Sequence, residues 1–266
     1  MGRRQRGLRV TRSVSCFHNE FVLREEINSS MQYLYRLEHR LKMLIRGLVW
    51  KPHQKVQSEA HSLLECDGHD LGCFVWRRLL PLVGTTPFPP DEIMLMSAAV
   101  LHVRPDVVIE WGTNIGISAR IFFEVSRAYG LDVDIHSIDL PLTVAHIEHP
   151  HRRRGCLVGH LPVTLHEGDG PVVAKPLLAQ AKRPLVFIDG DHDYKSVLRD
   201  GRAVIQSAPA AAILFHDTFF RPGANYNHGP HEAVRTIIQE LEGRYQVLEA
   251  ALGLPGMTAL FPQEDR

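Results

Sequence analysis

The sequence has few cysteines, no excess charge of either sign and no long apolar run. Its four cysteines form no CxxC pair and no regular spacing, which argues against a zinc ribbon or a disulfide scaffold and favours a reducing cytoplasm. Thirty Lys and Arg balance thirty Asp and Glu, so no global basic field is available for nucleic acid or an anionic membrane. No apolar run approaches the roughly 18 residues of a membrane span, and the basic start at 1–12 is not followed by a signal-peptide core. We therefore expect a small, locally bound ligand.

The 266 residues are enough for one large domain with an extension. We expect a basic, flexible tail at 1–23, a helical extension at 24–90 that ends in a Gly- and Pro-rich segment, and the main domain at 91–266. Apolar residues recur every three or four positions over 24–50, which predicts a helix with one apolar stripe. That stripe packs either on its own subunit or in a homo-oligomer interface.

Short apolar runs alternate with helical stretches after Pro105, and this pattern is typical of βαβ units. Strands are predicted at 107–110, 133–138, 163–166, 185–189 and 212–216, with helices near 91–102, 117–129, 171–181, 194–207 and 231–242. A final antiparallel pair is predicted at 245–250 and 257–261. The expected fold class is α/β, with a doubly wound, mostly parallel seven-stranded sheet of the Rossmann-like type.

The first predicted strand ends in Glu110 and is followed by a glycine-containing loop that opens a helix. Such a loop allows close approach of its backbone to a ligand, and the helix N-terminus offers amides to polar groups. The loop lacks the GxGxxG pattern of many dinucleotide sites, which disfavours an NAD-linked oxidoreductase. Its candidate binding residues are Glu110, Gly112, Thr113, Asn114, Gly116 and Ser118.

Acidic residues also follow the next two strands. Asp139 at the end of the second strand can accept both hydroxyls of a ribose, or it can act as a turn residue before Pro141. Gly168 and Asp169 after the third strand would lie beside a bound adenine.

The fourth and fifth strands end in the runs Phe187-Ile-Asp-Gly-Asp-His-Asp-Tyr194 and His216-Asp-Thr218. Adjacent parallel strands would bring Asp189 close to His216 and Asp217, and such oxygen and nitrogen donors suit Mg²⁺ or a similar divalent metal. The alternative is that these side chains only cap helices or pair with arginines. His192 is the candidate general base, with a supporting contact to the metal-binding carboxylates as its other reading.

These two runs, with the Glu110 loop, resemble the metal-dependent branch of class I S-adenosylmethionine-dependent O-methyltransferases, in particular the group of macrocin O-methyltransferase and cephalosporin-cluster methyltransferases. The resemblance covers about Asp91 to Phe261. It implies S-adenosylmethionine as cofactor, Mg²⁺ as the metal and a hydroxyl of a small molecule as methyl acceptor. A sugar is favoured over a catechol as that acceptor. The metal ligands would be Asp189, His216 and Asp217. Distant relatives have an acidic residue at the position of His216, so Asp191 is a reserve ligand.

Two segments would form a lid over these strand ends. They are a His- and Arg-rich loop at 141–161 and a loop at 219–230. A different class of function stays open as well, namely a regulatory or scaffold protein that binds a nucleotide without catalysis.

Overall fold

The computed structural model describes residues 41, 67–144, 153–221 and 226–263. The chain divides into two compact units, Met1–Leu48 and Val49–Arg266. Of the first unit, only Leu41 is described, and it is helical. The predicted tail at 1–23, the rest of the predicted helix at 24–50 and the centre of the loop at 141–161 lie outside the described residues.

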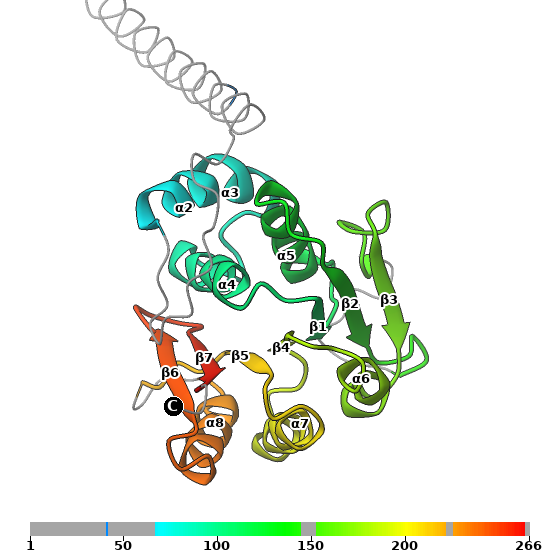
Figure 1. Ribbon diagram of the computed structural model, residues 1–266, viewed down its shortest axis with the longest axis vertical. Helices are drawn as coiled ribbons and strands as arrows, with labels where there is room; N and C mark the ends of the chain where they lie inside the picture. Colours follow the sequence, from blue (N-terminus) through cyan, green and yellow to red (C-terminus); the bar gives the residue numbers. More distant parts are fainter. Residues whose placement is uncertain (1–40, 42–66, 145–152, 222–225, 264–266) are drawn as a thin grey trace, which may run out of the picture. The chain divides into compact units, whose positions relative to one another are not determined.

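The second unit contains a seven-stranded sheet with the order β3-β2-β1-β4-β5-β7-β6 (Figure 1). The strands are β1 Val107–Trp111, β2 Asp134–Asp139, β3 Val163–Glu167, β4 Pro184–Ile188, β5 Ala212–His216, β6 Tyr245–Ala250 and β7 Met257–Pro262. β1 to β5 pair in parallel, whereas β7 pairs antiparallel with both β5 and β6. The predicted fold class is confirmed, and each predicted strand agrees with the structure to within one residue at either end.

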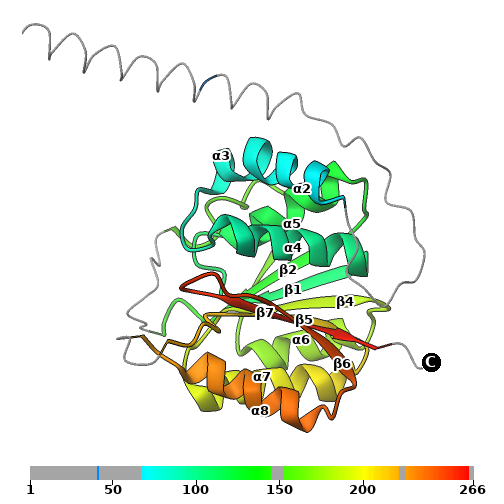
Figure 2. The same ribbon diagram turned by 90° about the vertical axis from the view of Figure 1, so that its left-hand side faces the viewer.

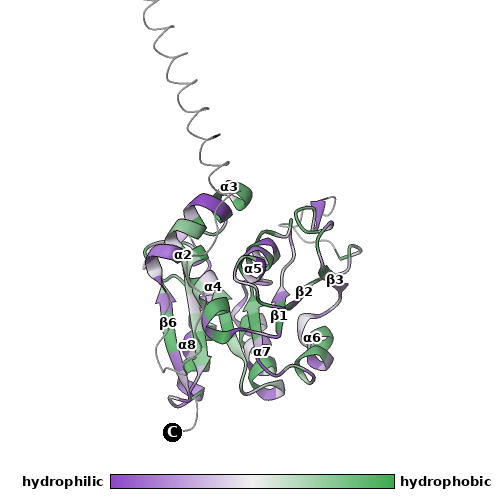
Figure 3. Cartoon of the chain, turned by 45° about the horizontal axis from the view of Figure 1, so that its top comes forward, coloured by the Kyte–Doolittle hydropathy of each residue, from purple (hydrophilic) through white to green (hydrophobic). Residues whose placement is uncertain are grey.

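Helices cover both faces of this sheet (Figure 2). One face carries α2 Gly68–Phe74, the π-helix η1 Val75–Leu79, α3 Leu80–Val83, α4 Pro90–Val103 and α5 Ile117–Ala128. The other carries α6 Gly170–Leu178, α7 Tyr194–Ser207 and α8 Gly229–Glu240. Figure 3 shows hydrophobic and hydrophilic residues interleaved along the helices, as expected where one side of each helix is buried. No helix in the described part of the chain has both the length and the hydropathy of a membrane span.

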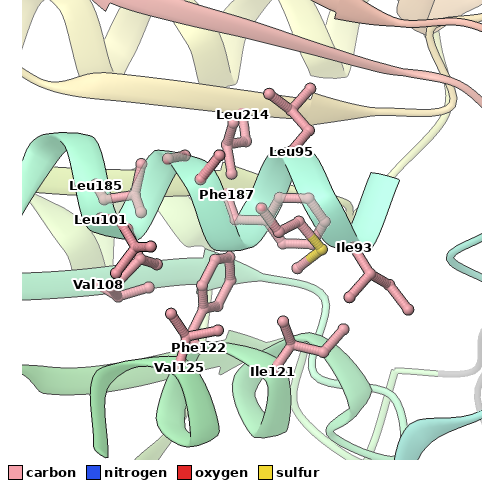
Figure 4. Close-up of a cluster of buried hydrophobic side chains, with 14 of the residues drawn as sticks. Ile93, Leu95, Leu101, Val108, Ile121, Phe122, Val125, Leu185, Phe187 and Leu214 are labelled. Atoms are coloured by element: carbon pink, nitrogen blue, oxygen red, sulfur yellow. The ribbon is translucent and has the colours of Figure 1, made fainter. Parts of the chain in front are cut away.

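The central strands are buried on both faces, and their side chains alternate between two cores. Val108, Phe187 and Leu214 pack against α4 and α5 (Figure 4). Val186, Ile188 and Ile213 pack into the second core, beneath α6, α7 and α8. The period of two therefore directs two polar residues further along these strands, Glu110 and His216, to the side of α4 and α5.

The strand order reverses between β1 and β4, since β2 and β3 lie beyond β1 while β5 lies beyond β4. In open sheets of this type, ligands bind beyond the carboxyl ends of the strands at such a switch point. The polar residues that follow β1, β2, β4 and β5 are therefore the ones to inspect for a site.

Candidate active site

The loop after β1 lies directly against the end of β4. Gly112 has φ +93°, and a Cβ at this position would lie 2.0 Å from the carbonyl oxygen of Asp189. The amide of Asp189 donates to the carbonyl of Trp111 over 3.1 Å. No side chain fits at Gly112, so this glycine brings the predicted binding loop and the end of β4 together. Gly116, with φ +91°, adopts the left-handed conformation at the N-cap of α5.

Glu110 is fully buried at the end of β1. The Ser137 hydroxyl donates to its Oε1 over 2.5 Å, and Thr113 Oγ1 lies 2.7 Å from the same hydroxyl. Burial raises the pKa of Glu110 to about 8, although the hydroxyls of Ser118 and Ser137 oppose this rise. The second oxygen, Oε2, makes no hydrogen bond of normal geometry to any described residue. A buried polar atom of this kind fits a site that a polar group of a ligand completes.

Asp139, predicted as the ribose acid, is almost buried and contacts the same loop. It accepts hydrogen bonds from the amides of Leu140 and Asn114, at 2.8 and 3.4 Å. Arg154 Nε lies 3.2 Å from its Oδ2, so an arginine of the predicted lid segment also reaches this carboxylate. The structure therefore joins Asn114 to Asp139, both of which are predicted cofactor residues, and adds Arg154 to them.

The two residues predicted beside the adenine follow β3. The amide of Gly168 donates to the carbonyl of Asp139 over 2.9 Å. Asp169 precedes α6 at its N-cap, and its carboxylate pairs with Arg199 at 2.9 Å. Gly168 is thus joined to the end of β2, whereas the Asp169 side chain is held by α7.

The ends of β4 and β5 bring Asp189, His216 and Asp217 together. His216 Nδ1 lies 2.9 Å from Asp189 Oδ1 and 3.3 Å from Asp217 Oδ2. His192 Nε2 lies 2.8 Å from the same Asp217 oxygen. Asp217 has φ 58°, a left-handed conformation that a non-glycine residue adopts only where its surroundings hold it. These four residues are called the acid and histidine cluster below.

The second nitrogen of the His216 ring faces a residue from outside the strand ends. Nε2 lies 3.0 Å from Oε2 of Glu92, near the start of α4. Burial by itself would lower the pKa of His216, but the charge of Asp189 and hydrogen bonds to Asp189, Asp217 and Glu92 outweigh it and raise this pKa well above its ordinary value. Both ring nitrogens therefore face carboxyl groups in this arrangement: Nδ1 faces Asp189 and Asp217, and Nε2 faces Glu92.

Among the described residues, Asp189, His192 and Asp217 form a group that could hold a metal ion, since their donor atoms lie within 4.8 Å of one another. Two carboxylates and an imidazole suit Mg²⁺, Mn²⁺ or a similar ion. His192 thus takes the place in this group that the sequence predicts for His216. Asp191, the reserve ligand, accepts from Ser196 Oγ at 2.6 Å and from the amide of Asp193 at 3.2 Å, at the turn into α7.

Two members of this region escaped sequence reasoning. Glu92 was not singled out, although it is an acidic residue followed directly by the apolar run Ile93-Met94-Leu95-Met96, and this contrast is a usable signal. Tyr226 was noticed only as part of a lid loop, yet its hydroxyl donates to Asp217 Oδ1. Burial opposes ionisation of Asp217, but hydrogen bonds from His192, His216 and Tyr226 outweigh it and hold the pKa of this carboxyl well below its usual range.

Comparison with known proteins finds a matching family model and a curated relative. Residues 109–218, which run from β1 to just beyond β5, match a family model described as a methyltransferase domain. The chain is 22% identical over 214 residues to a rhamnosyl O-methyltransferase of Mycobacterium leprae (strain TN), which covers 76% of this chain and 86% of that protein.

Two solved structures are also similar to the chain. An O-methyltransferase from Bacillus cereus in complex with SAH has a TM-score of 0.47 and 13% identity, over 77% of this chain and 92% of that chain. The SAH-bound methyltransferase PaMTH1 of Podospora anserina has a TM-score of 0.45 and 20% identity, over 65% of this chain and 78% of that chain.

The doubly wound sheet and the matched domain define the class of this protein. The chain is a methyltransferase, and the predicted enzyme class is confirmed at this level. The matched segment contains the loop after β1, Asp139 and the acid and histidine cluster.

Proposed function

We propose that the chain transfers the methyl group of S-adenosylmethionine to a hydroxyl oxygen of a small polyhydroxylated acceptor, with assistance from a divalent cation. One observation carries this proposal: the His192–Asp217 pair, at 2.8 Å, and Asp189 lie beside the glycine loop that ends β1. A base and two carboxylates are thus next to the predicted cofactor site, which is what methyl transfer to an alcohol requires.

The cofactor residues are proposed to be Glu110, Gly112, Thr113, Asn114, Gly116, Ser118, Asp139, Gly168 and Asp169. Two observations support this set: Glu110 Oε2 makes no hydrogen bond of normal geometry to any described residue, and Gly112 closely approaches the end of β4. S-adenosylmethionine, when bound, supplies an already activated methyl group. The remaining task of the protein is to place an acceptor oxygen in line and to remove its proton.

His192 is proposed as the general base. A proton on Nε2 is held by Asp217, which makes Nδ1 the basic nitrogen of that tautomer. As the acceptor hydroxyl loses its proton to Nδ1, the imidazole becomes cationic, and the neighbouring Asp217 carboxylate stabilises that charge.

Asp189 and Asp217 are proposed to hold the cation, for which Mg²⁺ is the first choice. A metal bound there supplies Lewis-acid polarisation of a substrate oxygen. His192 is close enough to be a third ligand. If it binds the metal, it does not act as the general base. His216, with both nitrogens directed at carboxylates, supports the two aspartates in this scheme.

A sugar unit is the favoured acceptor. The support is the likeness to the rhamnosyl O-methyltransferase, at 22% identity, together with the resemblance of the strand-end motifs. Neighbouring hydroxyls of a sugar could approach the pair of aspartates together. A catechol offers the same pair of oxygens and is the second acceptor to try.

The proposal is tested by calorimetry with S-adenosylmethionine and a mass-spectrometric screen of glycosides and catechols, each with Mg²⁺ and with a chelator. We expect cofactor binding in both conditions and transfer to a hydroxyl that the chelator suppresses. Cofactor binding without transfer to any hydroxyl would favour the catalytically inactive binding protein. Transfer at an unchanged rate with the chelator would remove the cation from the scheme.

A further inference from the structure

Glu92 is a buried carboxylate in the first turn of α4, with 1% of its surface exposed. One oxygen, Oε1, accepts from the amide of Gly256 over 2.7 Å, and the other lies 3.0 Å from His216 Nε2. Burying a carboxylate is unfavourable unless its oxygens are paired. Both oxygens of Glu92 are paired, and one of the two partners belongs to the acid and histidine cluster.

His216 is held on all sides. The ring is only 5% exposed, and its centroid lies 4.7 Å from that of Phe88 in an edge-to-face contact. Its two nitrogens are fixed by Glu92 on one side and by Asp189 and Asp217 on the other. The ring can therefore not rotate without breaking a contact with a buried carboxylate.

We propose that His216, anchored by Glu92, is a positioning residue for the catalytic cluster. It fixes the carboxylates of Asp189 and Asp217 on the side turned towards the protein interior, and Asp217 in turn orients His192. The inference deepens the proposed function, since it assigns a role to α4 in setting the direction of the proposed base.

The physical reason is the proximity of two carboxylates. Asp189 and Asp217 both lie within 3.3 Å of the same ring nitrogen, and like charges that close repel each other. A donating N–H between them offsets the repulsion and gives both groups one geometry. Without Glu92 the ring would lose its second anchor and could turn away, and Asp217 would then no longer hold His192 in one orientation.

A purely structural role is the competing explanation. Glu92 also joins α4 to the turn before β7 through Gly256, so its loss could simply weaken the fold. The test must therefore read the orientation of His192 separately from stability.

The matched variants are Glu92→Gln and Glu92→Leu, which are close in size. The Oε1 of glutamine can still accept from the Gly256 amide while its NH2 group donates to the Nε2 of a neutral His216 ring, whereas leucine can do neither. The first readout is the imidazole nitrogen and carbon-bound proton signals of His192 and His216, recorded by NMR on the free protein at one pH. Single His192→Gln and His216→Gln variants assign these signals.

We expect the His192 signals of Glu92→Gln to stay at the wild-type positions and those of Glu92→Leu to shift or broaden. Unchanged His192 signals in a folded Glu92→Leu protein would overturn the proposal. Should the leucine variant not fold, Glu92→Asp, which withdraws the carboxylate by one methylene, takes its place with the same two outcomes.

The second readout is turnover with the best acceptor from the screen. Glu92→Leu should lower kcat by about tenfold to a hundredfold, in line with the cost of a misplaced catalytic group. The Kd for S-adenosylmethionine, measured by calorimetry, should stay within about twofold, as expected when only transition-state contacts change. Glu92→Gln should restore kcat to within about threefold of wild type, an expectation based on its retained hydrogen bonds.

Failure of the proposed function is distinguishable from failure of this inference. Absence of turnover in the wild-type protein would contradict the proposed function. The NMR comparison would still decide whether Glu92 and His216 set the orientation of His192. Equal loss of kcat in the glutamine and leucine variants, with unmoved His192 signals, would reduce Glu92 to a structural residue.

Discussion

Glu110→Gln is the substitution whose effect follows most directly from the structure. Glu110 is fully buried and its pKa is raised to about 8 from an ordinary value of 4.5, chiefly because burial disfavours the charged form. A carboxyl with a raised folded-state pKa contributes stability that is fully present below pH 4.5 and is lost as the pH rises towards 8. Glutamine keeps the acceptor for Ser137 but does not titrate.

The magnitude follows from the two pKa values. Their difference, 8 minus 4.5, is 3.5, and each pH unit in that window corresponds to about 1.4 kcal/mol. Between pH 5 and pH 8 the wild-type protein should therefore lose about 3 to 4 kcal/mol of unfolding free energy relative to Glu110→Gln. The glutamine amide leaves an unpaired donor, which costs about 1–3 kcal/mol at every pH. This cost shifts the difference in unfolding free energy between the two proteins by a constant and does not change its dependence on pH.

The assay is urea unfolding of the cofactor-free protein at pH 5, 6, 7 and 8, followed by circular dichroism. The quantity of interest is the difference in unfolding free energy between wild type and Glu110→Gln at each pH. Exposed Glu242 supplies the control, since Glu242→Gln should change that difference by under about 0.5 kcal/mol. Parallel stability curves for wild type and Glu110→Gln across this range would refute the reasoning, because they would mean that Glu110 ionises as easily in the folded as in the unfolded chain.

Four further substitutions test the site. Asp189→Asn should abolish chelator-sensitive methyl transfer while the calorimetric Kd for S-adenosylmethionine stays within about twofold; an unchanged rate would contradict a metal role for this residue. His192→Gln should lower kcat at neutral pH by about 10² to 10⁴ and remove the fall in rate at low pH that protonation of a base causes; a wild-type pH profile would exclude it as base. Asp139→Asn should weaken cofactor binding about tenfold or more through the loss of charge-assisted hydrogen bonds, and equal affinity in calorimetry would separate Asp139 from the cofactor. Gly112→Ala should destabilise the fold by about 2 kcal/mol or more in urea unfolding, because its Cβ would lie 2.0 Å from the Asp189 carbonyl oxygen. Gly130→Ala is the control and should cost less, because its Cβ would meet no atom within 4 Å at a similarly positive φ.

The elements of the sheet could be predicted because each central strand is a short apolar run buried on both faces. Such runs, separated by amphipathic helices, have few alternatives to a doubly wound sheet. The polar residues at the strand ends could be identified for the same reason, since Asp139, Asp189 and His216 each end or follow a strand and Glu110 is the last residue but one of β1. Their convergence required only that parallel strands end at the same edge.

Partners from distant segments could not be predicted in this way. The contact of Glu92 with His216 joins residues 124 positions apart and depends on how α4 packs over β5. Arg154 reaches Asp139 because of the path of the chain before β3, where the sequence predicted only a His- and Arg-rich lid loop. The sequence around Glu92 or Arg154 does not indicate which residue either one contacts.

The sequence by itself determined the order of strands and helices, the loop after β1 and the chemical types gathered at the strand ends, because hydrophobic periodicity and turn residues act locally. Tertiary packing decided what each polar group contacts. His216 is directed towards Glu92 and the aspartates because α4 covers β5, and His192 is brought to Asp217 because the turn from β4 into α7 faces the end of β5. The direction of a side chain depends on the atoms that surround it, and those atoms come from elements that only the folded chain brings together.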